Sequence, residues 1–189
     1  MNDNLQHPFP FAYAYAAKEV QTIAAPLLTA AALSLAGVVA GASSKTFLWP
    51  GPTLLLLVAA SLLLVASIQL HYHSRQYLYT CADIEEWVPE DISPAVRAKL
   101  YEWQGDDFST WMVFHNRAVH CFNTGTVFLG IGVAAALWPP EEGTQATWRT
   151  VAAIMVLLGV AVEVGWMAHL YSRSGSLEEK RRRELSKIS

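Results

Sequence analysis

Four long apolar stretches divide this chain, and a single glutamate is the only charged residue among them. They occupy residues 23–42, 53–70, 119–138 and 150–170. A helix rises about 1.5 Å per residue, so roughly 20 apolar residues cross the hydrocarbon core of a bilayer. A soluble protein of 189 residues that buried four such helices would have too little polar surface left. The pattern therefore predicts an all-α integral membrane protein, a bundle of four transmembrane helices.

Basic residues predict the orientation of these helices. With an even number of spans, eleven lysine and arginine residues fall on one side of the membrane, and only Lys45 and Arg149 fall on the other. Cytoplasmic loops carry the excess of basic residues, so both termini are expected in the cytoplasm. The resulting parts are an interfacial N-terminus, a transmembrane hairpin, a cytoplasmic helical insertion, a second hairpin and a basic tail, at residues 1–19, 20–70, 71–116, 117–171 and 172–189.

The cytoplasmic insertion at residues 71–116 is the longest polar segment of the chain, and it contains clear helix caps. Thr80 followed by Asp83 has the spacing of a capping box, which predicts a short helix that Pro89 ends. Ser93 before Pro94 is an N-cap with proline at the first helical position. We therefore expect two small helices carried on a stalk formed by extensions of the second and third spans.

The second of these small helices is expected to close at Gly105, with a new helix starting near Phe108 and entering the third span. The insertion has no recognisable catalytic arrangement, but its aromatic and basic residues could bind a protein partner. The candidates for partner binding are Trp87, Arg97, Tyr101 and Trp103.

The single intramembrane carboxylate, Glu163, lies about 10 Å deep if its helix is regular. Asn123 and Thr124 fall at the same depth on the third span, and Thr29 and Ser67 lie close to that level. A charged group there costs about 2.5–3.5 kcal/mol on insertion scales, which makes Glu163, Asn123 and Thr124 a candidate polar site. The alternative is that Glu163 is hydrogen-bonded to Asn123 or a threonine and only holds helices together.

Two features of the first span concern packing. Gly37 and Gly41 form a G-x-x-x-G pair, whose shared face allows another helix to approach closely, in the same chain or in a second copy. Pro26 removes a backbone donor near the cytoplasmic end of the span and predicts a bend there.

Five of the six histidines cluster near the cytoplasmic ends of the spans. Imidazoles from different helices can ligate haem iron or a transition metal, so the sequence offers a haem or metal site as an alternative, although no cofactor is expected. The spacings do not place neighbouring histidines on one helix face, and histidine also suits the membrane interface. The candidate ligands are His71, His73, His115, His120 and His169.

The tail at residues 172–189 is rich in basic residues and has a Gly-Ser pair that predicts a break after the last span. A short charged helix on the anionic inner surface of the membrane is expected beyond this break, with lipid headgroups bound by Lys180, Arg181, Arg182 and Arg183.

Known catalytic and nucleotide-binding motifs are absent from the sequence. No region combines basic and aromatic residues in a way that predicts nucleic-acid binding. The sequence therefore favours a non-enzymatic protein of a bacterial inner membrane whose insertion senses or docks a partner, with a pore, effector or scaffold as output. Its expected partners are the bilayer and either further copies of itself or another protein. The alternative is a membrane oxidoreductase or a metal- or haem-binding protein that uses the histidines.

Overall fold

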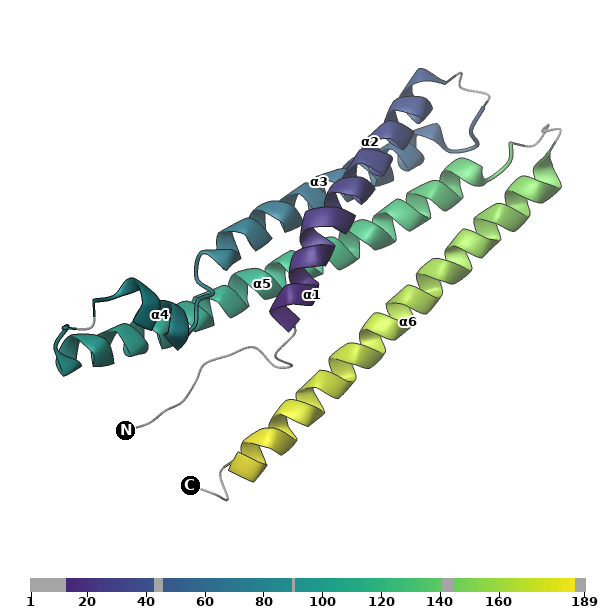
Figure 1. Cartoon of the computed structure of the whole chain (residues 1–189). Coiled ribbons are helices and arrows are strands. Elements are labelled where there is room, and N and C mark those ends of the chain that lie inside the picture. The colour runs from purple at the N-terminus through teal and green to yellow at the C-terminus, as the bar shows by residue number, and fades with distance from the viewer. Residues whose placement is uncertain (1–12, 43–45, 90, 141–144, 186–189) are drawn as a thin grey trace.

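The computed structural model describes residues 13–42, 46–89, 91–140 and 145–185, and all the regular elements within these ranges are helices (Figure 1). No strand occurs within them. The elements in order are α1 (Tyr13–Glu19), the π-helical turn η1 (Val20–Ala24), α2 (Ala25–Gly41), α3 (Pro50–Arg75), α4 (Cys81–Trp87), α5 (Pro94–Leu137) and α6 (Ala146–Leu185).

Four helical stretches are long and apolar enough to cross a membrane, which agrees with the predicted number of candidate spans. Each predicted apolar window falls on one of them. Their bounds are Ala16–Gly41, Pro50–Arg75, Pro94–Leu137 and Ala146–Ser172. The chain is therefore a helical protein with the features of a multi-pass membrane protein.

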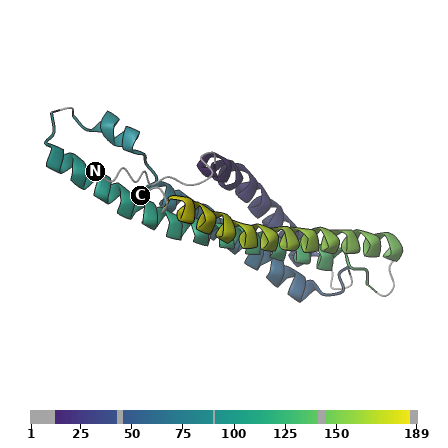
Figure 2. The same cartoon turned by 90° about the horizontal axis from the view of Figure 1, so that it is seen from below.

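The long helices lie side by side, with α4 at one end of the molecule (Figure 1). We call this end proximal; α1 begins and α6 finishes toward it, while the ends of α2 and α5 and the starts of α3 and α6 lie at the opposite, distal end. Figures 1 and 2 both show α4 folded back beside the first turns of α5, beyond the end of α3. The proximal part of α5 and α4 thus form a projection from the helical body.

The core of the body lies between α2, α3 and α5, and glycines allow α3 and α5 to approach closely. Leu57 and Leu64 of α3 are fully buried there. A Cβ added at Gly125 would lie 3.0 Å from the Leu64 side chain, and one added at Gly132 would lie 2.9 Å from Leu57. Hydrophobic packing therefore depends on α5 presenting almost bare backbone to the leucines of α3.

Helix α6 packs against α5 alone among the described elements, so the bundle is open on that side. The distal ends of the two helices are joined by Arg149, whose guanidinium donates to the carbonyl oxygens of Ala136 and Leu137 at 3.1 Å each. These are among the last carbonyls of α5, which have no partner within their own helix. Arg149 therefore caps α5 and ties the start of α6 to it.

The predicted helix end at Gly105 is wrong, because α5 runs without a break from Pro94 to Leu137. Gly105 costs helix stability but does not prevent a helix, and the residues around it are packed. Gln104, Phe108 and Trp111 are all buried on one face of α5. The insertion therefore contains one separate small helix, α4, and the second predicted helix is the proximal end of α5.

The Gly-Ser break predicted in the tail is also absent, since the backbone of α6 remains helical to Leu185. No proline follows the span, and glycine alone did not end the helix. Lys180, Arg181, Arg182 and Arg183 lie in this helical part, but their side chains lie outside what the structure describes. Residues 1–12 of the predicted interfacial N-terminus are likewise outside the described ranges.

In the first span, Pro26 is the second residue of α2, and η1 immediately precedes α2. A proline frees a carbonyl one turn earlier, and a π turn is one way a helix accommodates such a defect. Gly37 and Gly41 meet nothing within 4 Å of an added Cβ, so close packing within the chain does not use this G-x-x-x-G pair.

Candidate functional site

The projection is held together by local hydrogen bonds that the sequence indicated in part. The predicted capping box is present: Asp83 N–H donates to Thr80 Oγ1 at 3.2 Å, and the Thr80 N–H donates to Asp83 Oδ2 at 2.6 Å. Just before α4, the Tyr79 hydroxyl donates to Asp107 Oδ2 of α5 at 2.6 Å. Gln104 Nε2 donates to the Tyr79 carbonyl oxygen at 3.1 Å. The start of α4 is thereby fixed against α5.

These bonds also set the ionisation of two groups. The backbone N–H of Thr80 and then its hydroxyl hold the pKa of Asp83 below its usual value. The cap is therefore complete at neutral pH and is lost as pH falls through that lowered pKa. Burial and then the bond to Asp107 raise the pKa of Tyr79 to about 12, so its hydroxyl remains a donor at neutral pH.

Further along, an acidic residue of α4 connects it to two of the predicted partner-binding residues. Glu85 forms a salt bridge with Arg97 Nη1 at 3.1 Å, and it also accepts a hydrogen bond from the Tyr101 hydroxyl. Both groups are partly exposed, so this salt bridge orients α4 more than it stabilises it. Arg97 and Tyr101 are therefore engaged within the projection itself.

The other two predicted partner-binding residues, Trp87 and Trp103, form no side-chain hydrogen bond with the described residues and face outward. The exposed fractions are 68% for Trp87 and 53% for Trp103, and the neighbouring Val96 is 50% exposed. The segment from residue 83 to residue 107 contains eight acidic and two basic residues. The projection thus presents large apolar side chains within a strongly acidic segment.

The structure brings two of the five predicted histidine ligands together, one from each core helix. The rings of His71 on α3 and His115 on α5 are 6.0 Å apart between centroids, at an angle of 63°. Both are buried, and Trp111 stacks on His115 at 4.9 Å. Neither ring nitrogen of His71 has a hydrogen-bond partner, which is unusual for a buried imidazole.

The remaining three histidines lie elsewhere. His73 meets the edge of Phe114 at 4.7 Å, His120 stacks on Tyr171 at 5.7 Å, and His169 lies beside Trp166 at 6.1 Å. Within the described ranges, no group of three or more His, Cys, Asp or Glu residues is arranged to hold a metal ion. A haem or metal site stays a prediction, and the pair formed by His71 and His115 is its best starting point.

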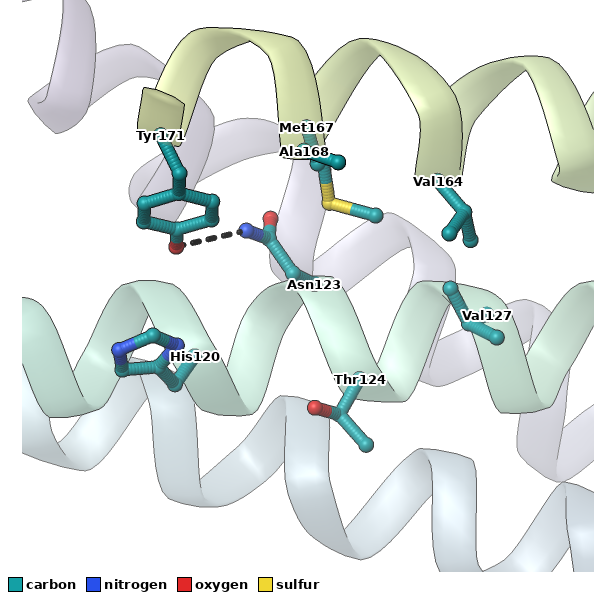
Figure 3. Close-up of a pocket in the computed structure, with 8 residues that line it drawn as sticks. All are labelled: His120, Asn123, Thr124, Val127, Val164, Met167, Ala168 and Tyr171. Carbon is teal, nitrogen blue, oxygen red and sulfur yellow. Dashed lines mark hydrogen bonds between the residues drawn. The ribbon is translucent and has the colours of Figure 1, made fainter. Parts of the chain in front are cut away.

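The residues of the predicted polar layer are not connected to one another in the structure. Asn123 Nδ2 donates to the Tyr171 hydroxyl at 3.4 Å, joining α5 to α6, rather than to Glu163 (Figure 3). Thr124 is exposed and lines a groove between α5 and α6 that Asn123 and Tyr171 also line. The Thr29 hydroxyl donates to the Ala25 carbonyl oxygen within its own helix. Glu163 is half-buried on α6 and makes no hydrogen bond with the described residues.

A buried junction that the sequence did not indicate lies between η1, α3 and α5. The Ser67 hydroxyl is 2.9 Å from both Gln21 Oε1 and the Ala118 carbonyl oxygen, and all of Ser67 is buried. Gln21 stands before the first apolar window, so the window gave no signal for it. Its position depends on the π turn, and Pro26 predicts a bend near this point but not a π turn.

Comparisons with known proteins give no relative for this arrangement. The chain matches no protein-family model, no curated protein and no solved structure.

Proposed function

We propose that this chain is a multi-pass protein of a bacterial cytoplasmic membrane that docks a soluble protein through the projection formed by α4 and the proximal part of α5. The observation that carries this is the combination of exposed Trp87 and Trp103 with an excess of acidic residues on a segment braced by hydrogen bonds. Tryptophan is enriched at protein interfaces, where it supplies much of the binding energy. The partner surface is therefore basic with apolar pockets.

Charge also supports the accessibility of the projection. Anionic lipids give the cytoplasmic face of a membrane a negative surface potential. An acidic segment is repelled by that surface, whereas a basic one would be drawn onto it. The projection therefore stands clear of the headgroups and leaves its tryptophans available to a partner.

The proposed output is a scaffold or pore built from several copies. Two features support assembly: α6 has only α5 as a neighbour within the described chain, and Gly37 and Gly41 remain open to a close approach. A protein that stays strictly monomeric in bilayers would refute this output.

The proposed orientation rests on the eleven-to-two distribution of basic residues. A reporter fused at Ser189 or inserted at Gly105 is expected to read cytoplasmic, and one inserted at Gly143 external. An external reading at Ser189 would contradict the orientation and place the projection outside the cytoplasm.

Site-specific photo-crosslinking tests the docking surface. A photoreactive residue in place of Trp103 is expected to capture a water-soluble cytoplasmic protein in intact cells, and Glu86→Gln should lower the yield because it removes an exposed negative charge. Trp148 is the matched control, since it is 77% exposed at the distal end of α6.

Equal capture of soluble protein from positions 103 and 148 would refute a dedicated docking surface. Capture of only a second copy of this chain would instead make the projection a self-association surface.

The second candidate function is a haem- or metal-binding membrane protein, and the buried pair of His71 and His115 favours it. The unpartnered nitrogens of His71 are the specific observation, because a buried polar group without a partner costs about 1–3 kcal/mol. The visible absorption spectrum and metal content of purified protein test it, and a colourless, metal-free sample would refute it.

A further inference from the structure

An elongated groove of about 340 Å³ lies between α5 and α6. Figure 3 shows that its polar and apolar lining is separated along its length: His120 and Tyr171 lie at one end, and Val127 and Val164 lie at the other. Asn123 lies between, bonded to Tyr171. The lining of the groove therefore matches an amphipathic ligand, one that is polar at one end and apolar at the other.

This division follows the expected depth in a bilayer. His120 begins and Tyr171 follows the apolar windows 119–138 and 150–170, so both lie at the proximal edge of the membrane region. Val127 and Val164 are each seven residues further along their helices, which is about 10 Å toward the hydrocarbon centre. The polar end thus meets the headgroup layer and the apolar end meets the acyl chains.

The groove is open to the side. Helix α6 contacts α5 alone among the described elements, and the lining residues Thr124, Val164 and Ala168 are exposed. In a membrane, the medium at this depth is lipid. A lipid molecule can therefore enter from the bilayer, whereas a water-soluble ligand would have to cross apolar surface.

The headgroup end is cationic. Arg117 is exposed one turn proximal of His120, on the same face of α5, and no acidic residue in the described chain forms a salt bridge with it. Toward the hydrocarbon centre, the nearest carboxylate on α6 is Glu163, eight residues or about 12 Å deeper than Tyr171; in the proximal direction it is Glu178, seven residues along the chain. A phosphate at the proximal end would thus meet positive charge and hydrogen-bond donors, with no carboxylate of α6 within about one helical turn of Tyr171.

We propose that this groove is a binding site for one anionic phospholipid. An acyl chain lies along Val127, Val164 and Met167, and the headgroup phosphate binds Arg117 and His120. An arginine fork matches phosphate geometry, which favours an anionic over a zwitterionic headgroup because no compensating cationic group competes for the phosphate. This site is independent of the proposed docking function.

Native mass spectrometry of the full chain in detergent tests the site, with phosphatidylglycerol or phosphatidylcholine added at equal concentration. The wild type is expected to retain one phosphatidylglycerol and at least several-fold less phosphatidylcholine. Val164→Trp fills the apolar end and should abolish retention. Val162→Trp is the matched control, because Val162 is 73% exposed and lies outside the groove. Ala168→Leu fills the groove more gently, should an unfolded Val164→Trp protein prevent the comparison.

Combined Arg117→Gln and His120→Asn is expected to remove the preference between the two lipids, whereas Lys99→Gln, on the projection, should preserve it. Equal retention of both lipids by the wild type, or equal retention by the Val164→Trp and Val162→Trp proteins, overturns the proposal. Binding of inorganic phosphate without lipid also overturns it, as does a coloured cofactor that the groove-filling variants displace.

Discussion

Gly130→Ala is expected to separate α6 from α5 and to lower the free energy of unfolding by about 1–3 kcal/mol, the usual cost of overpacking. A Cβ at position 130 would overlap Cγ2 of Val160, far inside contact distance. Valine in a helix strongly prefers one rotamer, so Val160 cannot easily turn away. Helix α6 has no other neighbour in the described chain to hold it, so the helix itself must move. The thermal unfolding midpoint in detergent measures the loss.

Two further variants make this expectation specific. Gly159→Ala adds the same methyl group to α6 where an added Cβ meets nothing within 4 Å, so it should be neutral or stabilising. Val160→Ala removes the obstructing methyl groups and should restore most of the stability of the Gly130→Ala protein, as a coupled pair does in a double-mutant cycle. An unchanged unfolding midpoint for Gly130→Ala, or no rescue by Val160→Ala, would contradict the close contact.

Glu163→Leu is expected to stabilise the protein by less than the insertion cost of about 2.5–3.5 kcal/mol for a charged residue, because α6 stays in the apolar phase on unfolding and part of that cost is present in both states. The structure gives Glu163 no hydrogen bond within the described chain, so leucine loses no interaction there. Glu163→Gln should be intermediate, since the amide is polar but uncharged. Val162→Leu is the control for helix α6 and should have little effect. Unfolding midpoints in detergent and in bilayers measure all three.

The result in bilayers separates two roles of this carboxylate. If the leucine variant is more stable and the protein still functions, Glu163 is dispensable. A leucine variant that is stabilised as a detergent monomer but loses assembly in bilayers would mean that Glu163 bonds to a second copy. Destabilisation of the monomer itself would contradict the unpartnered carboxylate.

The sequence predicted elements whose signals are local. Apolar runs of membrane length identified the four spans, and the Thr80 and Asp83 spacing correctly predicted the capping box of α4. The prediction failed where a glycine was taken as a helix end. Gly105 lies inside α5 because the buried residues on either side of it continue one packed face, and tertiary packing outweighs the cost of a glycine.

Which glycine faces which helix could not be read from the sequence. The G-x-x-x-G spacing directed attention to Gly37 and Gly41, yet close contacts occur at Gly125, Gly130 and Gly132. Spacing shows that residues share a face, but not what that face opposes. The partner of Asn123 was missed for the same reason: Tyr171 follows the apolar window, and only the register of α6 against α5 brings it near.

The unbroken course of α5 makes it a lever as well as a candidate membrane span. Its 44 residues measure about 66 Å, while the hydrocarbon layer takes up only about 30 Å of that length. If the lever pivots near Phe128, in the middle of its apolar window, the tip at Pro94 is about 51 Å from the pivot. A load on the tip that tilts α5 by about 10° moves it by about 9 Å, more than one helical turn. Arg149 fastens the short arm to α6, so the same tilt carries the distal end of α6 in the opposite direction.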